Sequence, residues 1–210
     1  MSGPMVRAIL NNRKSQTRRV VKPQPDKFID GVPIKGTMVT REEGQPDAHW
    51  GNEIKCPYGQ PGDRLWVKET HQMGFSTHVS DCGYLYRATD VGKRSHHGVY
   101  CYEKGGKYYD HYDKPFVWRP SIFMKRTASR ILLEIESVRV ERLQDISEED
   151  AIAEGIEEHG SSGWWKDYGC DSTVMESAVG SYQTLWESIN GPDSWARNPW
   201  VWVVTFRRLP

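Results

Sequence analysis

The longest strand-like segment, residues 129–143, places the strongest constraint on the fold. It reads "SRILLEIESVRVERL". Ile131, Leu133 and Ile135 share one parity, but Val138 and Val140 share the other. Because successive side chains of a strand point to opposite faces, this switch predicts a bulge or a sharp bend near residues 136 and 137. A long strand that bends in this way is typical of a small barrel.

Two other segments predict strands that could complete such a sheet. Residues 16–21 follow a basic turn and are expected to be extended. The final stretch "PWVWVVTFRRL" predicts a strand with Trp200, Trp202, Val204 and Phe206 on one face. A shorter strand is expected in "DRLWVKE", residues 63–69.

Three helices are expected beside these strands. The first begins at Ser2 and Pro4 and ends at two Asn residues, 11 and 12, since Asn tolerates a left-handed C-terminal cap. The second covers 145–156 with Ser147 as its N-terminal cap. The third carries an apolar stripe at helical spacing and ends at Asn-Gly-Pro, residues 190–192.

The remaining segments are predicted to be loops or short strands around a single core. Residues 23–62 are rich in Pro and Gly and are expected to form a loop that holds at most a short hairpin. Residues 70–118 mix short aromatic strands with turns, and 157–171 are expected to be a loop. We therefore predict one domain over residues 1–210.

Charge is balanced overall but not locally. The chain of 210 residues has 28 basic and 28 acidic residues. Residues 1–25 carry six Arg or Lys and no Asp or Glu. A local positive field on a neutral chain suits an anionic or nucleotide-like ligand better than a long duplex.

The cysteines and the hydropathy pattern bear on the compartment. The four cysteines are scattered without a C-x-x-C, and no apolar run approaches the roughly 20 residues of a membrane span. No segment resembles a secretory signal. We expect a cytoplasmic protein with reduced thiols and no membrane partner.

Several stretches resemble one known superfamily. "AILNNRKSQTRR" is similar to the signature Gly-x-Lys-x-x-(Thr/Glu)-x-Arg of the ASCH domain, a relative of the PUA RNA-binding barrel. The stretches "GDRLWVKE", "ILLEIESVRV", "LQDISEEDAIAEGI" and "WVWVVTFRRL" extend the likeness, which also reaches ASCH proteins of phages and prophages. Asn12 stands at the signature Gly, and Asn is the residue best able to replace Gly in a left-handed turn.

The resemblance implies a fold and a site. The fold would be α+β, a PUA-like, mostly antiparallel β-barrel flanked by two or three helices, with long loop insertions at 23–58 and 70–125. The chain resembles most closely the N4-acetylcytidine amidohydrolase branch, in which a Lys, a Thr and a Glu act together. Carried over by motif, these are Lys14, Thr17 and Glu154. The implied activity is amide hydrolysis on N4-acylated cytosine nucleosides or a related modified nucleobase, without a cofactor.

The residue types suit that chemistry. A threonine hydroxyl is a poor nucleophile and needs a neighbouring base. Lys14 can serve if burial and the cations Arg13, Arg18 and Arg19 lower its pKa. Glu154 would then hold Lys14 and relay a proton to the leaving amine.

Other residues are expected around the substrate. Either the Arg19 side chain or backbone amides at the turn would stabilise the developing oxyanion, and Arg13 and Arg19 would both contact the substrate. Glu69 is a candidate ligand to it, with a surface carboxylate as the alternative. Trp164 and Trp165 are expected to stack on a base, with packing as the alternative.

Other interpretations of the same residues stay open. The spacing of Lys14 and Thr17 also fits an ordinary solvated turn. Glu154 lies on the flank of its helix rather than on the face of Ile152 and Ile156, so an exposed carboxylate is its alternative.

Other functions and partners also stay open. The chain could bind RNA or a modified cytidine nucleotide without chemistry, or act as a metal-dependent ribonuclease. His96, His97, Cys101 and His111, with Cys82, fit no standard zinc spacing, so we expect no metal.

Overall fold

The computed structural model describes residues 2–29, 31–35, 52–75, 82–91, 101–104, 107–110, 115–160, 163–170 and 172–210. Contacts divide the chain into two compact units. The first comprises Met1–Asn12, Arg64–Leu133 and Arg208–Pro210; the second comprises Arg13–Asp63 and Glu134–Arg207. The single domain over residues 1–210, and the insertions within it, stay predictions.

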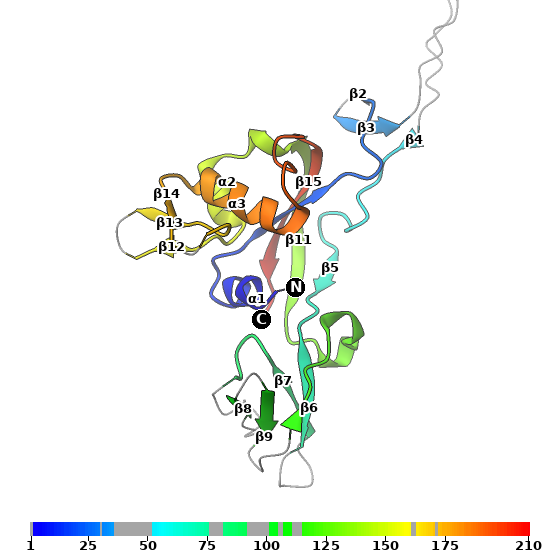
Figure 1. The fold of residues 1–210 in the computed structure, drawn as a ribbon. Helices are drawn as coiled ribbons and strands as arrows, with labels where there is room; N and C mark the ends of the chain where they lie inside the picture. Colours follow the sequence, from blue (N-terminus) through cyan, green and yellow to red (C-terminus); the bar gives the residue numbers. More distant parts are fainter. Residues whose placement is uncertain are drawn as a thin grey trace, which may run out of the picture. The chain divides into compact units, whose positions relative to one another are not determined.

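The first unit combines one helix with short strands (Figure 1). Helix α1 spans Gly3–Leu10, has Pro in its first turn and buries Val6 and Ile9. Asn12 follows with a φ of 56°, so the predicted left-handed end of this helix is confirmed. The strands are β5 (Arg64–Trp66), β6 (His71–Phe75), β7 (Cys82–Tyr86), β8 (Cys101–Lys104), β9 (Lys107–Asp110) and β10 (Pro115–Phe116). Two 3-10 turns, Ser121–Phe123 and Arg126–Ala128, complete the unit.

The second unit holds most of the long elements. Its helices are α2 (Glu148–Ala153) and α3 (Ala178–Asn190). Its strands are β1 (Gln16–Val20), β2 (Lys27–Ile29), β3 (Val32–Lys35), β4 (Asn52–Glu53), β12 (Glu158–His159), β13 (Trp164–Lys166), β14 (Val174–Met175), and nearly all of β11 (Leu132–Arg142) and β15 (Trp200–Arg208). A 3-10 turn at Leu143–Asp145 leads from β11 toward α2.

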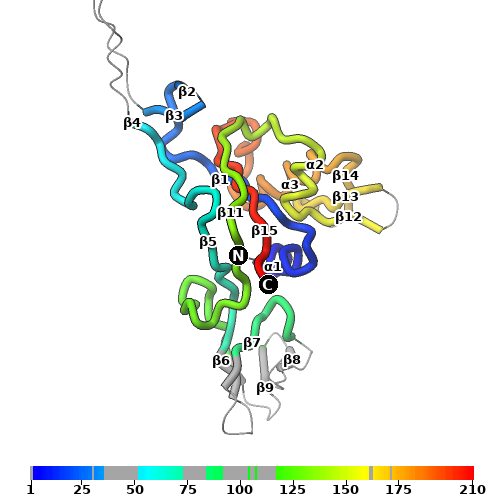
Figure 2. Tube along the Cα trace, turned by 180° about the vertical axis from the view of Figure 1, so that it is seen from behind, coloured from blue at the N-terminus to red at the C-terminus, as the bar shows by residue number. Residues whose placement is uncertain are grey.

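The main sheet has the strand order β1-β15-β11-β5 and is curled into a half-barrel. Figure 2 shows β1, β15 and β11 side by side. β1 and β15 are antiparallel, with Thr17 opposite Val204 and Arg19 opposite Trp202. The described part of the chain is thus a mixed α+β protein with mostly antiparallel strands and three α-helices, as expected.

Strand β11 changes its buried face where the sequence predicts. Leu133 and Ile135 are buried, Glu136 and Ser137 are both exposed, and Val138 and Val140 are half-buried on either side of the exposed Arg139. Two successive exposed residues in one strand are consistent with a local bend that exchanges the two faces.

Strand β15 is buried on both faces, which differs from the prediction of one apolar face. Trp202, Val204 and Phe206 are buried as expected, but Val201 and Val203 are also inaccessible to solvent. Val203 lies opposite Arg18, whose side chain contacts Asp150 of α2. The second apolar face is therefore needed because α2 covers it.

The predicted loop at 157–171 is wrong in its first half. Glu158–His159 and Trp164–Lys166 form the antiparallel pair β12–β13, and β14 adds a third strand. Gly160 and Gly163 both take a φ of 73°, a conformation that allows the chain to reverse. Figure 1 shows this small sheet beside α2 and α3. The short hairpin allowed within 23–62 is confirmed as β2–β3, extended by β4.

No helix in the described ranges is long and apolar enough to cross a membrane.

The cap of α2 gives a first test of the fold. The Ser147 hydroxyl accepts a hydrogen bond from the Asp150 N–H at 3.1 Å. We expect Ser147→Ala to lower the free energy of unfolding in urea by about 1 kcal/mol, because one N–H of the first turn loses its partner. Ser188→Ala, inside α3, is the control and should change stability by less than about 0.5 kcal/mol. Equal effects of the two substitutions would contradict the capping role.

Candidate active site

Lys14 and Glu154 form a buried ion pair within the second unit. The Lys14 Nζ donates to the Glu154 Oε2 at 2.7 Å and to the Glu154 backbone carbonyl at 2.7 Å. The two side chains are only 4% and 5% exposed. The structure therefore brings together two of the three residues that the resemblance assigns to catalysis.

Backbone contacts hold this pair in register. Lys14 and Glu154 form an isolated antiparallel bridge, and the Ser15 N–H donates to the Ala153 carbonyl at 2.9 Å. Glu154 caps the C-terminus of α2, and Gly155 follows with a φ of 85°. The end of α2 is thereby fixed against the start of β1.

The sequence predicted a helix with Ile152 and Ile156 on one face and Glu154 on its flank, and the structure differs from this prediction. Ile156 is buried, but Ile152 is 44% exposed. Helix α2 ends at Ala153, so the helical periodicity does not extend to residue 156. The alternative of an exposed Glu154 is therefore wrong.

Arg18 extends the pair into a larger cluster. Its side chain has no exposed surface and forms ion pairs with Glu141 at 2.6 Å and Asp150 at 2.7 Å, and a longer one with Glu154 at 3.7 Å. Gln16 donates to Asp150 at 3.1 Å and accepts a hydrogen bond from Arg18. The Tyr182 hydroxyl lies 3.5 Å from the Glu154 Oε1, to which it donates. We call Lys14, Gln16, Arg18, Glu141, Asp150, Glu154 and Tyr182 the buried charge network.

Four members of this network were not predicted from the sequence as site residues: Gln16, Glu141, Asp150 and Tyr182. One signal was present, because Lys14, Gln16 and Arg18 are polar residues of the same parity at the start of β1. Side chains of the same parity share one face of a strand. The partners on β11, α2 and α3 carry no comparable local signal.

Burial sets the protonation behaviour of Lys14. Loss of solvent is the largest influence and lowers the pKa of Lys14 below its usual value; the Glu154 carboxylate opposes this shift, and Arg19 and Arg18 reinforce it. Arg13, the third cation predicted to lower this pKa, contacts the Ile156 carbonyl at 3.3 Å and Glu157 at 3.5 Å, and its side chain is 39% exposed. A lysine with a lowered pKa is a better proton acceptor near neutral pH.

The pKa values of two further groups of the network are shifted. Burial, followed by the charge of Glu154, raises the pKa of Tyr182 well above its usual value. Burial acts most strongly on Asp150 and would raise its pKa, but hydrogen bonds from Arg18 and Gln16 outweigh it, so the pKa of Asp150 is lowered. The carboxylate of Asp150 is therefore held ionised, and Tyr182 is held neutral.

Thr17 lies on the other face of β1. It is half-buried opposite Val204, whereas Gln16 and Arg18 face α2. Among the described residues, no hydrogen bond joins the Thr17 hydroxyl to Lys14 or Glu154. The structure thus separates Thr17 from the other two predicted catalytic residues by the thickness of the strand.

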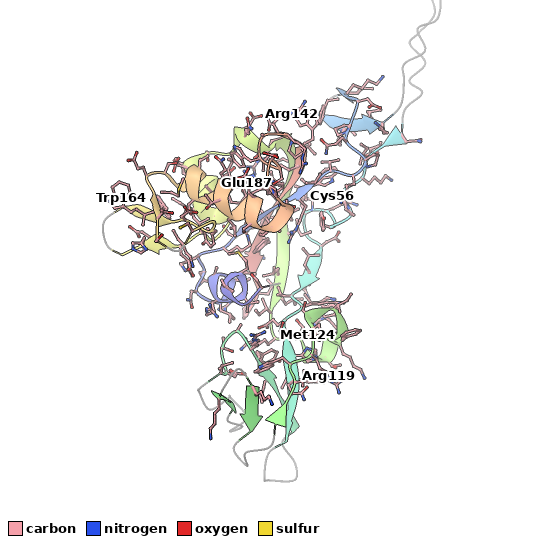
Figure 3. All side chains as sticks on the ribbon, in the orientation of Figure 1. Cys56, Arg119, Met124, Arg142, Trp164 and Glu187 are labelled. Atoms are coloured by element: carbon pink, nitrogen blue, oxygen red, sulfur yellow. The ribbon has the colours of Figure 1, made fainter. Side chains whose placement is uncertain are left out.

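A cavity of about 490 Å³ lies on the Thr17 side of the sheet. One wall consists of Val138, Val140 and Trp202, and the other of residues from 31–33, 53–56 and 59–61. Trp202 is directly opposite Arg19, so these two side chains share a face with Thr17. Figure 3 labels Cys56, which lines this cavity and whose thiol pKa is raised by burial.

The other predicted substrate residues lie elsewhere. Glu69 belongs to the first unit, is 1% exposed and forms two hydrogen bonds with Arg130, at 3.0 and 2.8 Å. Glu69 is therefore buried, and its alternative interpretation as a surface carboxylate is wrong. Trp164, labelled in Figure 3, lies on β13 and is 39% exposed, and Trp165 is half-buried.

The possible metal ligands are only partly described. Within the described ranges, no group of three or more His, Cys, Asp or Glu side chains is arranged to hold a metal ion. His96, His97 and His111 lie outside the described residues, as do the side chains of Cys82 and Cys101.

Comparison of the chain with protein-family models, with curated proteins and with solved structures finds no match in any of the three.

The ion pair itself can be tested by stability. Glu154→Gln leaves the Lys14 ammonium buried beside a neutral amide, so we expect the free energy of unfolding to fall by about 3 kcal/mol or more. Adding Lys14→Met to Glu154→Gln should recover part of this loss. Glu158→Gln, on an exposed residue of β12, is the matched control. A single Glu154→Gln variant as stable as the control would contradict a charged pair.

The lowered pKa of Lys14 predicts a pH dependence. Between this lowered value and the usual lysine pKa of about 10.4, the unfolded chain binds more protons than the folded chain. Stability attributable to Lys14 therefore rises with pH across this window. We expect the difference in unfolding free energy between wild type and Lys14→Met to grow in favour of wild type as pH rises from neutral toward 10. A difference that is constant or shrinks would contradict the lowered pKa.

Proposed function

We propose that the chain is an amidohydrolase acting on N4-acylated cytosine nucleosides or on a related modified nucleobase. The observation that carries the proposal is Lys14, which is excluded from solvent, has a lowered pKa and is held at 2.7 Å by Glu154. Perturbed groups of this kind gather at catalytic sites because proton transfer needs a pKa near the working pH. The resemblance to ASCH domains supports the same assignment, and the α+β fold with a curled antiparallel sheet is compatible with a PUA-like barrel.

The proposed chemistry is acyl transfer from the exocyclic nitrogen. A nucleophile attacks the acyl carbon while Lys14 accepts its proton, and a tetrahedral oxyanion forms. The C–N bond then breaks, and the protonated Lys14 returns the proton to the leaving amine. Glu154 positions the Lys14 amino group, which is neutral before the attack and protonated after it. With water as the net co-reactant, the products are the free cytosine base or nucleoside and a carboxylic acid.

The identity of the nucleophile divides this proposal into two forms. The resemblance assigns the attack to Thr17, with an acyl ester that water later hydrolyses. That role requires the Thr17 hydroxyl to reach Lys14 in the substrate complex, since β1 separates them here. In the second form, a water molecule bound by Lys14 attacks directly, and Thr17 only lines the substrate side.

A second candidate function is binding of a modified nucleotide without chemistry. The cavity on the Thr17 side favours it, because about 490 Å³ falls in the range of small-molecule sites and is sufficient for a nucleoside. Arg19, opposite the cavity-lining Trp202, would provide a cation for a phosphate. Nothing in the described residues favours the metal-dependent ribonuclease.

The direct test is turnover of N4-acetylcytidine to cytidine, followed by absorbance. We expect wild type to be active, and Lys14→Met and Glu154→Gln to lose at least about 100-fold in kcat/KM, the usual contribution of a general base. Lys35→Met removes a lysine that pairs with Asp26 at 2.7 Å and should keep full activity. Circular dichroism must show each variant folded.

Thr17 variants separate the two forms of the mechanism. If Thr17 is the nucleophile, Thr17→Val abolishes turnover and Thr17→Ser restores part of it. Turnover unchanged by Thr17→Val would assign the attack to water. Absence of wild-type turnover, together with nucleoside binding that the cavity-filling Val138→Phe removes, would replace the enzyme by the binding module.

A further inference from the structure

A second functional surface is suggested by a cationic segment of the first unit. Residues 117–131 read "VWRPSIFMKRTASRI" and contain four Arg or Lys and no Asp or Glu. We call this segment the 117–131 loop. In a chain with equal numbers of acidic and basic residues, such a segment concentrates positive charge locally.

The 117–131 loop is firmly anchored. Trp118, Met124 and Ala128 are buried, and the Met124 Sδ accepts the Glu69 N–H at 3.1 Å. Arg119 and His71 exchange two backbone hydrogen bonds, at 2.8 and 3.2 Å. Figure 3 shows Arg119 and Met124 close together in this part of the first unit. The side chains between these anchors are therefore held in a defined orientation.

The same loop exposes large apolar side chains. Ile122 and Phe123 are each 69% exposed, and Val117 is 82% exposed. Ile122 and Phe123 lie on the 3-10 turn Ser121–Phe123, between the buried Trp118 and Met124, and Val117 directly precedes Trp118. Single exposed apolar residues are common, but here an aromatic ring and an isoleucine lie in adjacent positions among cations.

No carboxylate among the described residues neutralises the cations around these side chains. Arg119, Lys125 and Arg126 are exposed, and none of them forms a salt bridge with any residue that the structure describes. Arg126 instead lies 6.0 Å from the centre of the Trp66 ring, and Lys68 lies 4.9 Å from the same ring. Arg130, by contrast, already forms an ion pair with Glu69. The loop therefore offers positive charge to an external anion.

We propose that the 117–131 loop binds single-stranded nucleic acid, with a base stacked on Phe123 and neighbouring phosphates bound by Arg119, Lys125 and Arg126. The combination of an exposed aromatic ring with uncompensated cations matches what an unpaired nucleotide offers, a π-face beside a phosphate. A membrane surface would call for an amphipathic helix with a wide apolar face, and the loop has only two short 3-10 turns, Ser121–Phe123 and Arg126–Ala128. A small anion alone would gain nothing from Ile122 and Phe123.

This proposal is independent of the amidohydrolase. It uses residues of the first unit only, whereas the buried charge network lies in the second. It can therefore hold or fail whichever function the Lys14 site has.

The test is fluorescence anisotropy with a labelled single-stranded oligonucleotide, over a range of salt concentrations. We expect wild type to bind, with affinity that falls as salt rises. Phe123→Ala should weaken binding about ten-fold, the effect of losing one stacked base. Lys125→Ala combined with Arg126→Ala should reduce the salt slope by about 0.7 for each phosphate that the variant no longer binds. Ile189→Ala and Lys107→Ala, both on exposed residues elsewhere, are the controls for apolar and charged truncation.

Three results would overturn the proposal. The first is wild-type protein that fails to bind the single strand at low salt. The second is binding that Phe123→Ala and the double variant leave unchanged. The third is binding to vesicles of anionic phospholipid but not to the oligonucleotide, which would assign the loop to a membrane surface.

Discussion

The burial of an ammonium beside a carboxylate is the interaction on which the rest of the second unit depends. Neither Lys14 nor Glu154 could be excluded from water alone, because an isolated buried charge costs several kcal/mol. Together they are tolerated only in one register, with Ser15 bonded to Ala153 and the end of α2 held at the start of β1. Arg18 repeats the arrangement further along the strand with Glu141 and Asp150. These pairs therefore specify how the short helix α2 lies against the sheet.

Strand β1 consequently has two faces with different chemistry. Gln16 and Arg18 face α2 and belong to the buried charge network, in which the pKa values of Lys14, Asp150 and Tyr182 are shifted. Thr17 and Arg19 face the side of Trp202 and the cavity that it lines. A catalytic mechanism that joins Lys14 to Thr17 must connect these faces, whereas a water nucleophile or a pure binding role needs no such connection. The position of one hydroxyl group thus separates the three accounts.

The sequence predicted those features that depend on neighbouring residues. The left-handed Asn12, the Ser147 cap and the change of face in β11 all follow from local patterns, and all are present. The strand pair β12–β13 was missed because Gly and Ser beside two Trp residues have the composition of a loop. The burial of Glu154 was also missed, since it depends on Lys14, a residue 140 positions away. Pairing of distant charges has no periodic signature in a single sequence.

The protonation of Lys14 is the property that most directly tests whether this residue can act as the base of the proposed mechanism. The side-chain nitrogen or the adjacent carbon of Lys14 can be followed by NMR as pH is raised, with Lys14→Met used to assign the signal. If Lys14 is a base, its titration midpoint lies below the usual lysine pKa of about 10.4. The midpoint decreases further in Glu154→Gln, because the carboxylate opposes the effect of burial. A midpoint at or above the usual value would mean that Lys14 is a permanent structural cation, and would remove the base from the proposed mechanism.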